Sequence, residues 1–263
     1  NGIWMLKQNP VSQSVTVESQ LDRDWDIQDT GDFDNDGNAD LLWRNTRSGE
    51  ATIWFMNNEV VRERLTLPAF AADLSWTIQG TGDFNLDGSR DILWRNSLNG
   101  ELGIWLMNQG RFAQSVSLAQ SSALDWWIEG IVDLNGDRSL DLVWRGSGGE
   151  VGYWLLNRTA FSQSATITTV NDLGWSIEGL ADFNGDRFQD LLWHNRVTGE
   201  SGIWVMNGTR FERPINLGVA TPGWFMSGVG DFNVDGSMDI LWRQFTTGNN
   251  AVWYLNQGEF SLG

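Results

Sequence analysis

Short apolar runs alternate with polar turns along the whole chain. Each run holds about four to eight residues rich in Ile, Val, Trp and Phe, and Gly, Asn or Asp bounds each of them. Runs of this length and composition predict β-strands, and the 3.6-residue period of an amphipathic helix is absent. The pattern therefore predicts an all-β protein.

One stretch of the chain shows how the predicted strands are grouped. Four runs follow each other closely, at residues 76–82, 91–95, 102–108 and 112–118. They are apolar on both faces, as expected for a sheet packed between two others. A four-stranded meander of ~40–50 residues that recurs along a chain is typical of β-propeller blades.

The same unit recurs five times. Its most regular part is an aspartate-rich segment, which begins a new copy after 51, 50, 49 and 49 residues. An apolar pair and then Trp followed by a basic residue come after each copy. The five segments are residues 32–40, 83–91, 133–141, 182–190 and 231–239.

The two ends of the chain leave the number of blades open between five and six. Residues 3–17 resemble the third and fourth strands of a unit, and residues 251–256 resemble another third strand. We expect a single β-propeller domain over residues 1–263, with five ~50-residue repeats and half-repeats at the termini. In a five-bladed ring, the N-terminal strands would complete the last blade and the C-terminal strand would be surplus. Six blades, one of them incomplete, are the alternative.

The aspartate segments have the spacing of a loop that surrounds one hard cation. Oxygen-bearing side chains stand at positions 1, 3, 5 and 9, and the carbonyl of position 7 can add another ligand. The predicted metal ligands are Asp32, Asp34, Asp36 and Asp40; Asp83, Asn85, Asp87 and Asp91; Asp133, Asn135, Asp137 and Asp141; Asp182, Asn184, Asp186 and Asp190; and Asp231, Asn233, Asp235 and Asp239.

Two of the five loops depart from the pattern at position 6. Glycine there supplies the positive φ that the turn requires, but Arg138 and Arg187 replace it in the third and fourth loops. We expect these two loops to bind metal more weakly or to differ in shape. None of the loops has Glu at position 12 or a flanking helix, so they are strand-to-strand loops.

Turn formation alone would also explain Asp, Asn and Gly in one such segment. Five copies that keep acidic positions 1, 5 and 9 favour a metal. The loops hold four carboxylates in the first copy and three in each other copy, sixteen of 34 acidic residues. Crowded carboxylates need a neutralising cation. About five structural Ca²⁺ ions would change the formal charge from −17 to about −7.

The segment Gly31-Asp32-Phe33-Asp34-Asn35-Asp36-Gly37 and its copies resemble the FG-GAP (VCBS-type) repeats of integrin α-subunit propellers and of many secreted bacterial proteins. The resemblance covers essentially the whole chain. It implies a propeller with Ca²⁺ held between the first and second strands of each blade, in a chiefly structural role. Some propeller lectins have similar repeats, with pockets between adjacent blades.

Tryptophans gather at the opposite end of each predicted blade. Seventeen Trp residues stand against two Tyr. Indole beside basic and acidic groups is a common way to hold a sugar ring. The alternative is structural, with Arg stacked on Trp and paired to a Glu of the next turn. The candidate ligand-binding residues are Trp25, Arg44, Trp76, Arg95, Trp126, Trp127, Arg145, Trp175, His194, Trp224 and Arg243.

Composition excludes several function classes. The formal charge of −17 argues against nucleic acid and anionic membranes as partners. With no cysteine and a single histidine, neither a thiolate nucleophile nor a multi-histidine metal site can form. An apolar run of the ~20 residues that a membrane helix needs is absent, so we expect no membrane insertion.

Three functions remain open. We expect a multivalent lectin that binds glycans or cell-surface glycoconjugates, because weak repeated sites gain strength together. A protein-binding adhesin or scaffold is the alternative. A polysaccharide-active enzyme that uses carboxylates in the central channel comes third, and no catalytic residue is assigned. Calcium loops of this type work at extracellular calcium levels, so we expect a secreted or cell-surface protein.

Overall fold

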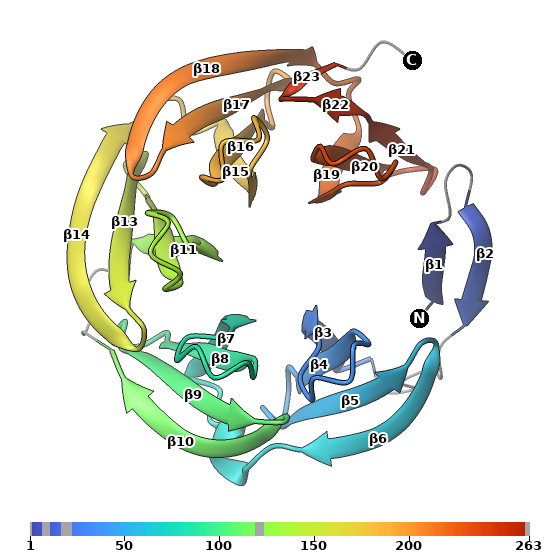
Figure 1. Ribbon diagram of the computed structural model, residues 1–263, viewed down its shortest axis with the longest axis vertical. Coiled ribbons are helices and arrows are strands. Elements are labelled where there is room, and N and C mark those ends of the chain that lie inside the picture. The colour runs from blue at the N-terminus through green and yellow to red at the C-terminus, as the bar shows by residue number, and fades with distance from the viewer. Residues whose placement is uncertain (1, 7–10, 17–22, 119–123, 261–263) are drawn as a thin grey trace. The chain divides into compact units, whose positions relative to one another are not determined.

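The computed structural model describes residues 2–6, 11–16, 23–118 and 124–260. Apart from one 3-10 helix, η1 (Ala69–Ala72), the regular elements of this part of the chain are antiparallel strands (Figure 1). Within it, no helix has the length and apolar character needed to cross a bilayer. The predicted all-β class is confirmed.

Five successive sheets form the blades of a β-propeller. Each of the first four blades is a meander of four strands in chain order. Their bounds are β3 (Trp25–Gly31), β4 (Asp40–Asn45), β5 (Ala51–Asn57) and β6 (Val60–Thr66); β7 (Trp76–Gly82), β8 (Asp91–Asn96), β9 (Leu102–Asn108) and β10 (Arg111–Ser117); β11 (Trp126–Val132), β12 (Asp141–Gly146), β13 (Glu150–Asn157) and β14 (Ala160–Thr169); and β15 (Trp175–Ala181), β16 (Asp190–Asn195), β17 (Glu200–Asn207) and β18 (Arg210–Val219).

The fifth blade differs in its outer strands. It pairs β19 (Trp224–Gly230), β20 (Asp239–Gln244) and β21 (Asn250–Trp253), and a short hairpin of β22 (Leu255–Asn256) and β23 (Glu259–Phe260) follows. The N-terminal strands β1 (Gly2–Leu6) and β2 (Val11–Thr16) form a separate two-stranded sheet. Five blades are confirmed, but the expected completion of the last blade by N-terminal strands is wrong: its third strand is the local β21.

The chain divides into two compact units, residues 1–124 with 156–161 and residues 125–155 with 162–263. In the first unit β3 lies beside β7, and Phe33, Ile53 and Trp94 are buried in one core. In the second unit β11 lies beside β15 and β15 beside β19. Burial of large side chains from consecutive blades supplies most of the stabilisation.

Stacked indole pairs account for most of the tryptophans. In every blade a Trp of the second strand contacts a Trp of the third, with ring centroids 4.6–5.0 Å apart and planes tilted by 41–50°. Such tilted pairs are favourable beyond the area they bury. The pairs are Trp43–Trp54, Trp94–Trp105, Trp144–Trp154, Trp193–Trp204 and Trp242–Trp253.

Candidate calcium loops and a tryptophan-lined pocket

Backbone hydrogen bonds to the aspartates shape each loop. In the fourth loop, Asp182 accepts bonds from the backbone N–H groups of Asp186 and Arg187, at 3.1 and 2.8 Å. Asp186 accepts a further bond from the Phe188 N–H, at 2.8 Å. The equivalent bonds recur in the other four loops. The carboxylates at positions 1 and 5 therefore hold the turn as well as facing its centre.

The ninth aspartate ties each loop to the blade. Asp190 is completely buried and accepts bonds from the Phe183 N–H at 3.0 Å and from the Met206 N–H of β17 at 2.8 Å. Asp40, Asp91 and Asp239 bond in the same way. A carboxylate oxygen has a second lone pair, so each can also face a cation.

The third and fourth loops have the same backbone as the others. Positions 4 and 6 have positive φ in all five loops, and the glycine simply changes place. Gly136 and Gly185 stand at position 4, with φ of 80° and 81°, while Arg138 and Arg187 at position 6 have φ of 74° and 76°. The expected difference in shape is therefore wrong, and the expected difference in affinity stays a prediction.

Asparagine at position 3 braces four of the loops. Its amide donates to the carboxylate at position 5, at 2.7–3.0 Å, and its carbonyl oxygen accepts that residue's N–H. In the first loop, oxygens of Asp32, Asp34 and Asp40 lie within 4.8 Å of one another. Such oxygen sets suit Ca²⁺, which prefers carboxylates and carbonyls.

Burial changes the acidity of the ninth aspartates. Desolvation raises the pKa of Asp91 and of Asp190 to about 6, against the N–H bonds that each accepts. Near position 5 the balance differs, because the backbone N–H of Ser237 lowers the pKa of Asp235. Without a cation, the carboxylates of Asp91 and Asp190 therefore take up a proton at a pH well above the usual range for a carboxyl group.

We expect calcium affinity to fall as the pH drops below about 6. A proton on Asp91 or Asp190 must leave when a cation binds, so the affinity of each site falls by up to about tenfold per pH unit. The raised pKa also means that the calcium-free fold gains stability as the pH falls through about 6. Calorimetric titration at pH 7.5, 6 and 5 measures the effect, and equal affinities at all three values would contradict it.

The basic residues at the other end of the blades are mostly buried. Arg44 lies over the ring of Trp94 in the next blade, 4.9 Å from its centroid, and Arg145 lies 5.0 Å from that of Trp193. Their guanidinium groups donate to backbone carbonyls. Arg95 and His194 are also buried, whereas Arg243 is exposed. The stacking of Arg44 and Arg145 on tryptophan agrees with the structural alternative, whereas their described hydrogen bonds go to backbone carbonyls and not to the expected Glu.

His194 is fully accounted for by structural contacts. Its Nδ1 lies 3.0 Å from the Ser201 Oγ, and its ring meets the edge of Trp242 with centroids 5.4 Å apart. Burial lowers the pKa of the imidazole. The side chain therefore helps to join neighbouring blades.

The tryptophans that begin the first strand of each blade are half-buried, and one further tryptophan beside them is more exposed. Trp127, which follows Trp126 in β11, is 51% exposed. Trp25, Trp76, Trp126, Trp175 and Trp224 are all of intermediate burial. Strand register places them away from the aspartate loop, since Trp25 pairs with Asn45 and Gly31 with Asp40. At ~3.4 Å per residue, the two ends of the strand lie about 20 Å apart.

A pocket of ≈ 470 Å³ opens beside the second blade. Three indoles line it, those of Trp76, Trp94 and Trp105, together with Glu101 and the hydroxyl of Ser115. Trp94 is 2% exposed, and its Nε1 has no hydrogen-bond partner. The other lining residues are Ala69, Asp73, Leu102, Gly103, Val116 and Ser117.

A small side chain on β10 keeps this pocket open. Ser115 pairs with Trp105 across the sheet. In the first blade Arg64 pairs with Trp54 in the same way, and its guanidinium lies 4.6 Å from the centroid of that ring. Sequence reasoning assigned Trp76 but missed Trp94, Trp105 and Ser115. The sequence signal for this pocket is Ser115, which stands where the first blade has Arg64.

Comparison with known proteins supports the repeat and the fold. Residues 133–193 and 182–242 each match the FG-GAP-like repeat, as predicted for this part of the chain. No curated protein matches the chain. Among solved structures, it resembles a protein of unknown function from Bacteroides caccae, at 10% identity and a TM-score of 0.56, covering 99% of this chain and 88% of the other.

Two other solved structures are similar in fold. A chain of the nidogen/laminin complex has 13% identity and a TM-score of 0.58, over 98% of this chain and 90% of that chain. Raptor from Chaetomium thermophilum has 13% identity and a TM-score of 0.52, over 91% of this chain and 20% of its own. At such low identity these likenesses show the fold alone.

Proposed function

We propose that this propeller with FG-GAP-like repeats is a non-catalytic recognition module, stabilised by calcium, that binds carbohydrate in the pocket of its second blade. The observation that carries the proposal is the pocket itself, in which three indoles meet acidic and hydroxyl groups. Few other uses fit a site that combines wide aromatic faces with several hydrogen-bond acceptors.

The chemistry of the pocket suits a neutral sugar. C–H groups of a pyranose can lie on an indole face. Sugar hydroxyls can donate to Glu101 or Asp73 and exchange bonds with Ser115 and Ser117, which all line the pocket. The formal charge of −17 disfavours acidic glycans.

Calcium is assigned to the loops that have Asn at position 3. They offer carboxylates at positions 1, 5 and 9 and an amide oxygen at position 3, which fits Ca²⁺. The ligands would be Asp83, Asn85, Asp87 and Asp91 in the second loop and their equivalents in the third to fifth. Because loop and tryptophans lie at opposite ends of a strand, these ions would shape the blades without touching the sugar.

The proposal assigns no catalysis. Most of the clustered acids belong to the repeated loops, where backbone N–H groups hold them. Of the remaining acids in the second unit, Glu178 accepts bonds from Ser176 and Arg196, and burial raises the pKa of Glu129. Two carboxyl groups, those of Asp73 and Glu101, line the pocket, but Asp73 accepts bonds from the N–H and hydroxyl of Ser75, whereas a glycosidase needs two free carboxyl groups on either side of a bound sugar.

We expect the substitution Ser115→Arg to abolish sugar binding, with a loss of at least tenfold in affinity. Arginine there should lie on Trp105 as Arg64 lies on Trp54, and so fill the pocket without disturbing the core. A glycan array identifies the sugar, and calorimetry with that sugar compares wild type, Ser115→Arg and the matched control Ser115→Ala. The control should bind as wild type does.

Two results would overturn the sugar assignment. One is equal binding by wild type and Ser115→Arg. The other is a wild-type protein that binds no glycan at high density, with or without Ca²⁺. The second result would favour the alternative function, a protein-binding adhesin or scaffold.

Exposed apolar side chains on individual turns support that alternative. Exposed apolar residues stand on the turns between second and third strands: Leu98 is 76% exposed, Val197 83% and Phe245 81%. Isolated apolar residues are common on surfaces, but turn tips are usually polar. For either function we propose a place outside the cell, where calcium is abundant.

A further inference from the structure

The first aspartate loop departs from the other four at two positions at once. Position 3 is Asp34, where the other loops have Asn. The second departure lies on the outer strand of the same blade, where Arg62 is the extra residue of a β-bulge in β6. The bulges of β10 and β18 place Ala113 and Glu212 at the equivalent position. Arginine is thus found where the loop has its extra carboxylate.

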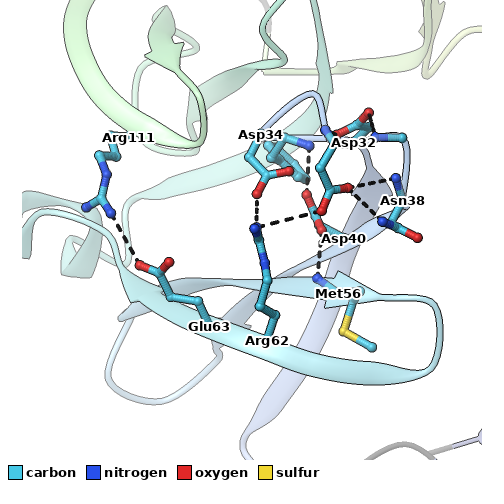
Figure 2. Close-up of polar contacts among 11 residues, drawn as sticks. Asp32, Asp34, Asn38, Asp40, Met56, Arg62, Glu63 and Arg111 are labelled. Carbon is cyan, nitrogen blue, oxygen red and sulfur yellow. Dashed lines mark hydrogen bonds and ion pairs between the residues drawn. The ribbon is translucent and has the colours of Figure 1, made fainter.

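These two residues meet in space. The Arg62 guanidinium forms an ion pair with Asp34 Oδ2, as Figure 2 shows. It also lies 3.8 Å from Asp36 Oδ2. Asp34 is largely buried, with 13% of its side chain exposed, and Arg62 is 46% exposed. The group therefore reaches from solvent into the ring of carboxylates formed with Asp32 and Asp40.

The neighbouring contacts hold Arg62 in this position. The Arg62 guanidinium lies over the ring of Phe55 in β5, with its central carbon 5.7 Å from the ring centroid. The next residue, Glu63, pairs with Arg111 of the second blade at 3.2 Å (Figure 2). Consecutive residues of β6 thus form one ion pair with the loop and one with the adjacent blade.

The fourth carboxylate of the first loop is offset by the Arg62 guanidinium that contacts it. Four carboxylates and one guanidinium give a formal charge of −3, and each of the other loops has three carboxylates and no such cation in the described contacts. A divalent cation bound at the Asp34 carboxylate, even at the buried and unpartnered Oδ1, would lie close to the like charge of the guanidinium on Oδ2. The additional carboxylate of the first loop, Asp34, therefore has its counter-charge in the side chain of Arg62.

We propose that Arg62 is the resident cation of the first loop, which holds its shape without calcium at concentrations that fill the other four loops. This inference rests on the proposed calcium role of those loops. It reduces the five ions expected from sequence to four. It also gives the first blade a stability that does not vary with calcium.

The test compares calcium binding by the full chain and by two single variants, after chelation and dialysis. Calorimetric titration should give four ions for wild type and for the matched control Arg64→Ala, whose arginine lies over Trp54 and not at the loop. Arg62→Ala should bind a fifth calcium ion. Its affinity for that ion should be at least tenfold higher than the affinity of wild type for any fifth calcium ion. Five equivalent ions in wild type would overturn the proposal.

A second variant and a second readout separate this inference from the proposed function. Asp34→Asn with Arg62→Ala recreates the pattern of the second loop and should fold and bind five ions. In EDTA, Arg62→Ala alone should melt at least 5 °C below Arg64→Ala, because four carboxylates lose their counter-charge. If wild type binds no calcium but this difference is found, only the calcium role of the other loops fails. If Arg62→Ala and Arg64→Ala melt together in EDTA, Arg62 is not the resident cation.

Discussion

Removal of calcium with excess EDTA should lower the melting temperature of the protein by about 20 °C or more. An ion that binds only the folded state at a hundred times its Kd adds about 2.7 kcal/mol, so four such ions add about 10 kcal/mol. Without them, the three carboxylates in each of the second to fifth loops lose their counter-charge. Differential scanning calorimetry of the same sample with Ca²⁺ and with EDTA measures the shift.

Re-addition of Ca²⁺ should restore the original melting curve, which separates metal removal from irreversible damage. Magnesium at the same concentration should restore less, because it demands six ligands in near-ideal octahedral geometry at shorter distances. Superimposed curves with and without EDTA would contradict a structural role for calcium.

Replacing the ninth aspartate should destabilise a single blade strongly. In Asp190→Ala, the N–H groups of Phe183 and Met206 lose their buried acceptors. Each unsatisfied buried group costs about 1–3 kcal/mol, so we expect a loss of about 2–6 kcal/mol in EDTA. Urea unfolding of the calcium-free protein measures this loss. With calcium present the loss should be larger, because the fourth site also loses a ligand.

Two matched variants show whether the hydrogen bonds are responsible. Asp190→Asn keeps an oxygen for one N–H and should fall between wild type and Asp190→Ala. Glu212→Ala removes an exposed carboxylate from β18 of the same blade and should change stability by less than about 0.5 kcal/mol. An Asp190→Ala protein as stable as wild type would show that this carboxylate does not tie the loop to the blade.

The repeat made much of the fold predictable. Strands, blade number and loop positions follow from a pattern that recurs at 49–51 residues, and each loop is closed by bonds within nine residues. The local nature of these bonds also explains the equal shape of the third and fourth loops. Gly136 and Gly185 take one positive-φ position, so that Arg138 and Arg187 take the other.

Features that depend on pairing between distant strands could not be predicted in the same way. The bond from Met206 to Asp190 joins residues sixteen apart, and the bulge that directs Arg62 at Asp34 depends on the register of β5 and β6. Likewise, Ser115 opens a pocket only because it pairs with Trp105. The C-terminal β21 completed the last blade because it directly follows β20, whereas sequence likeness alone did not choose between it and the N-terminal strands.

Anomalous scattering from a crystal grown with Ca²⁺ would show whether calcium occupies the four loops with Asn at position 3. With X-rays of long wavelength, we expect anomalous peaks about 2.3–2.6 Å from the oxygens of Asp83, Asp133, Asp182 and Asp231, and from their partners in each loop. We expect no peak between Asp34 and Arg62. Water alone at all four places would show that these loops do not bind calcium.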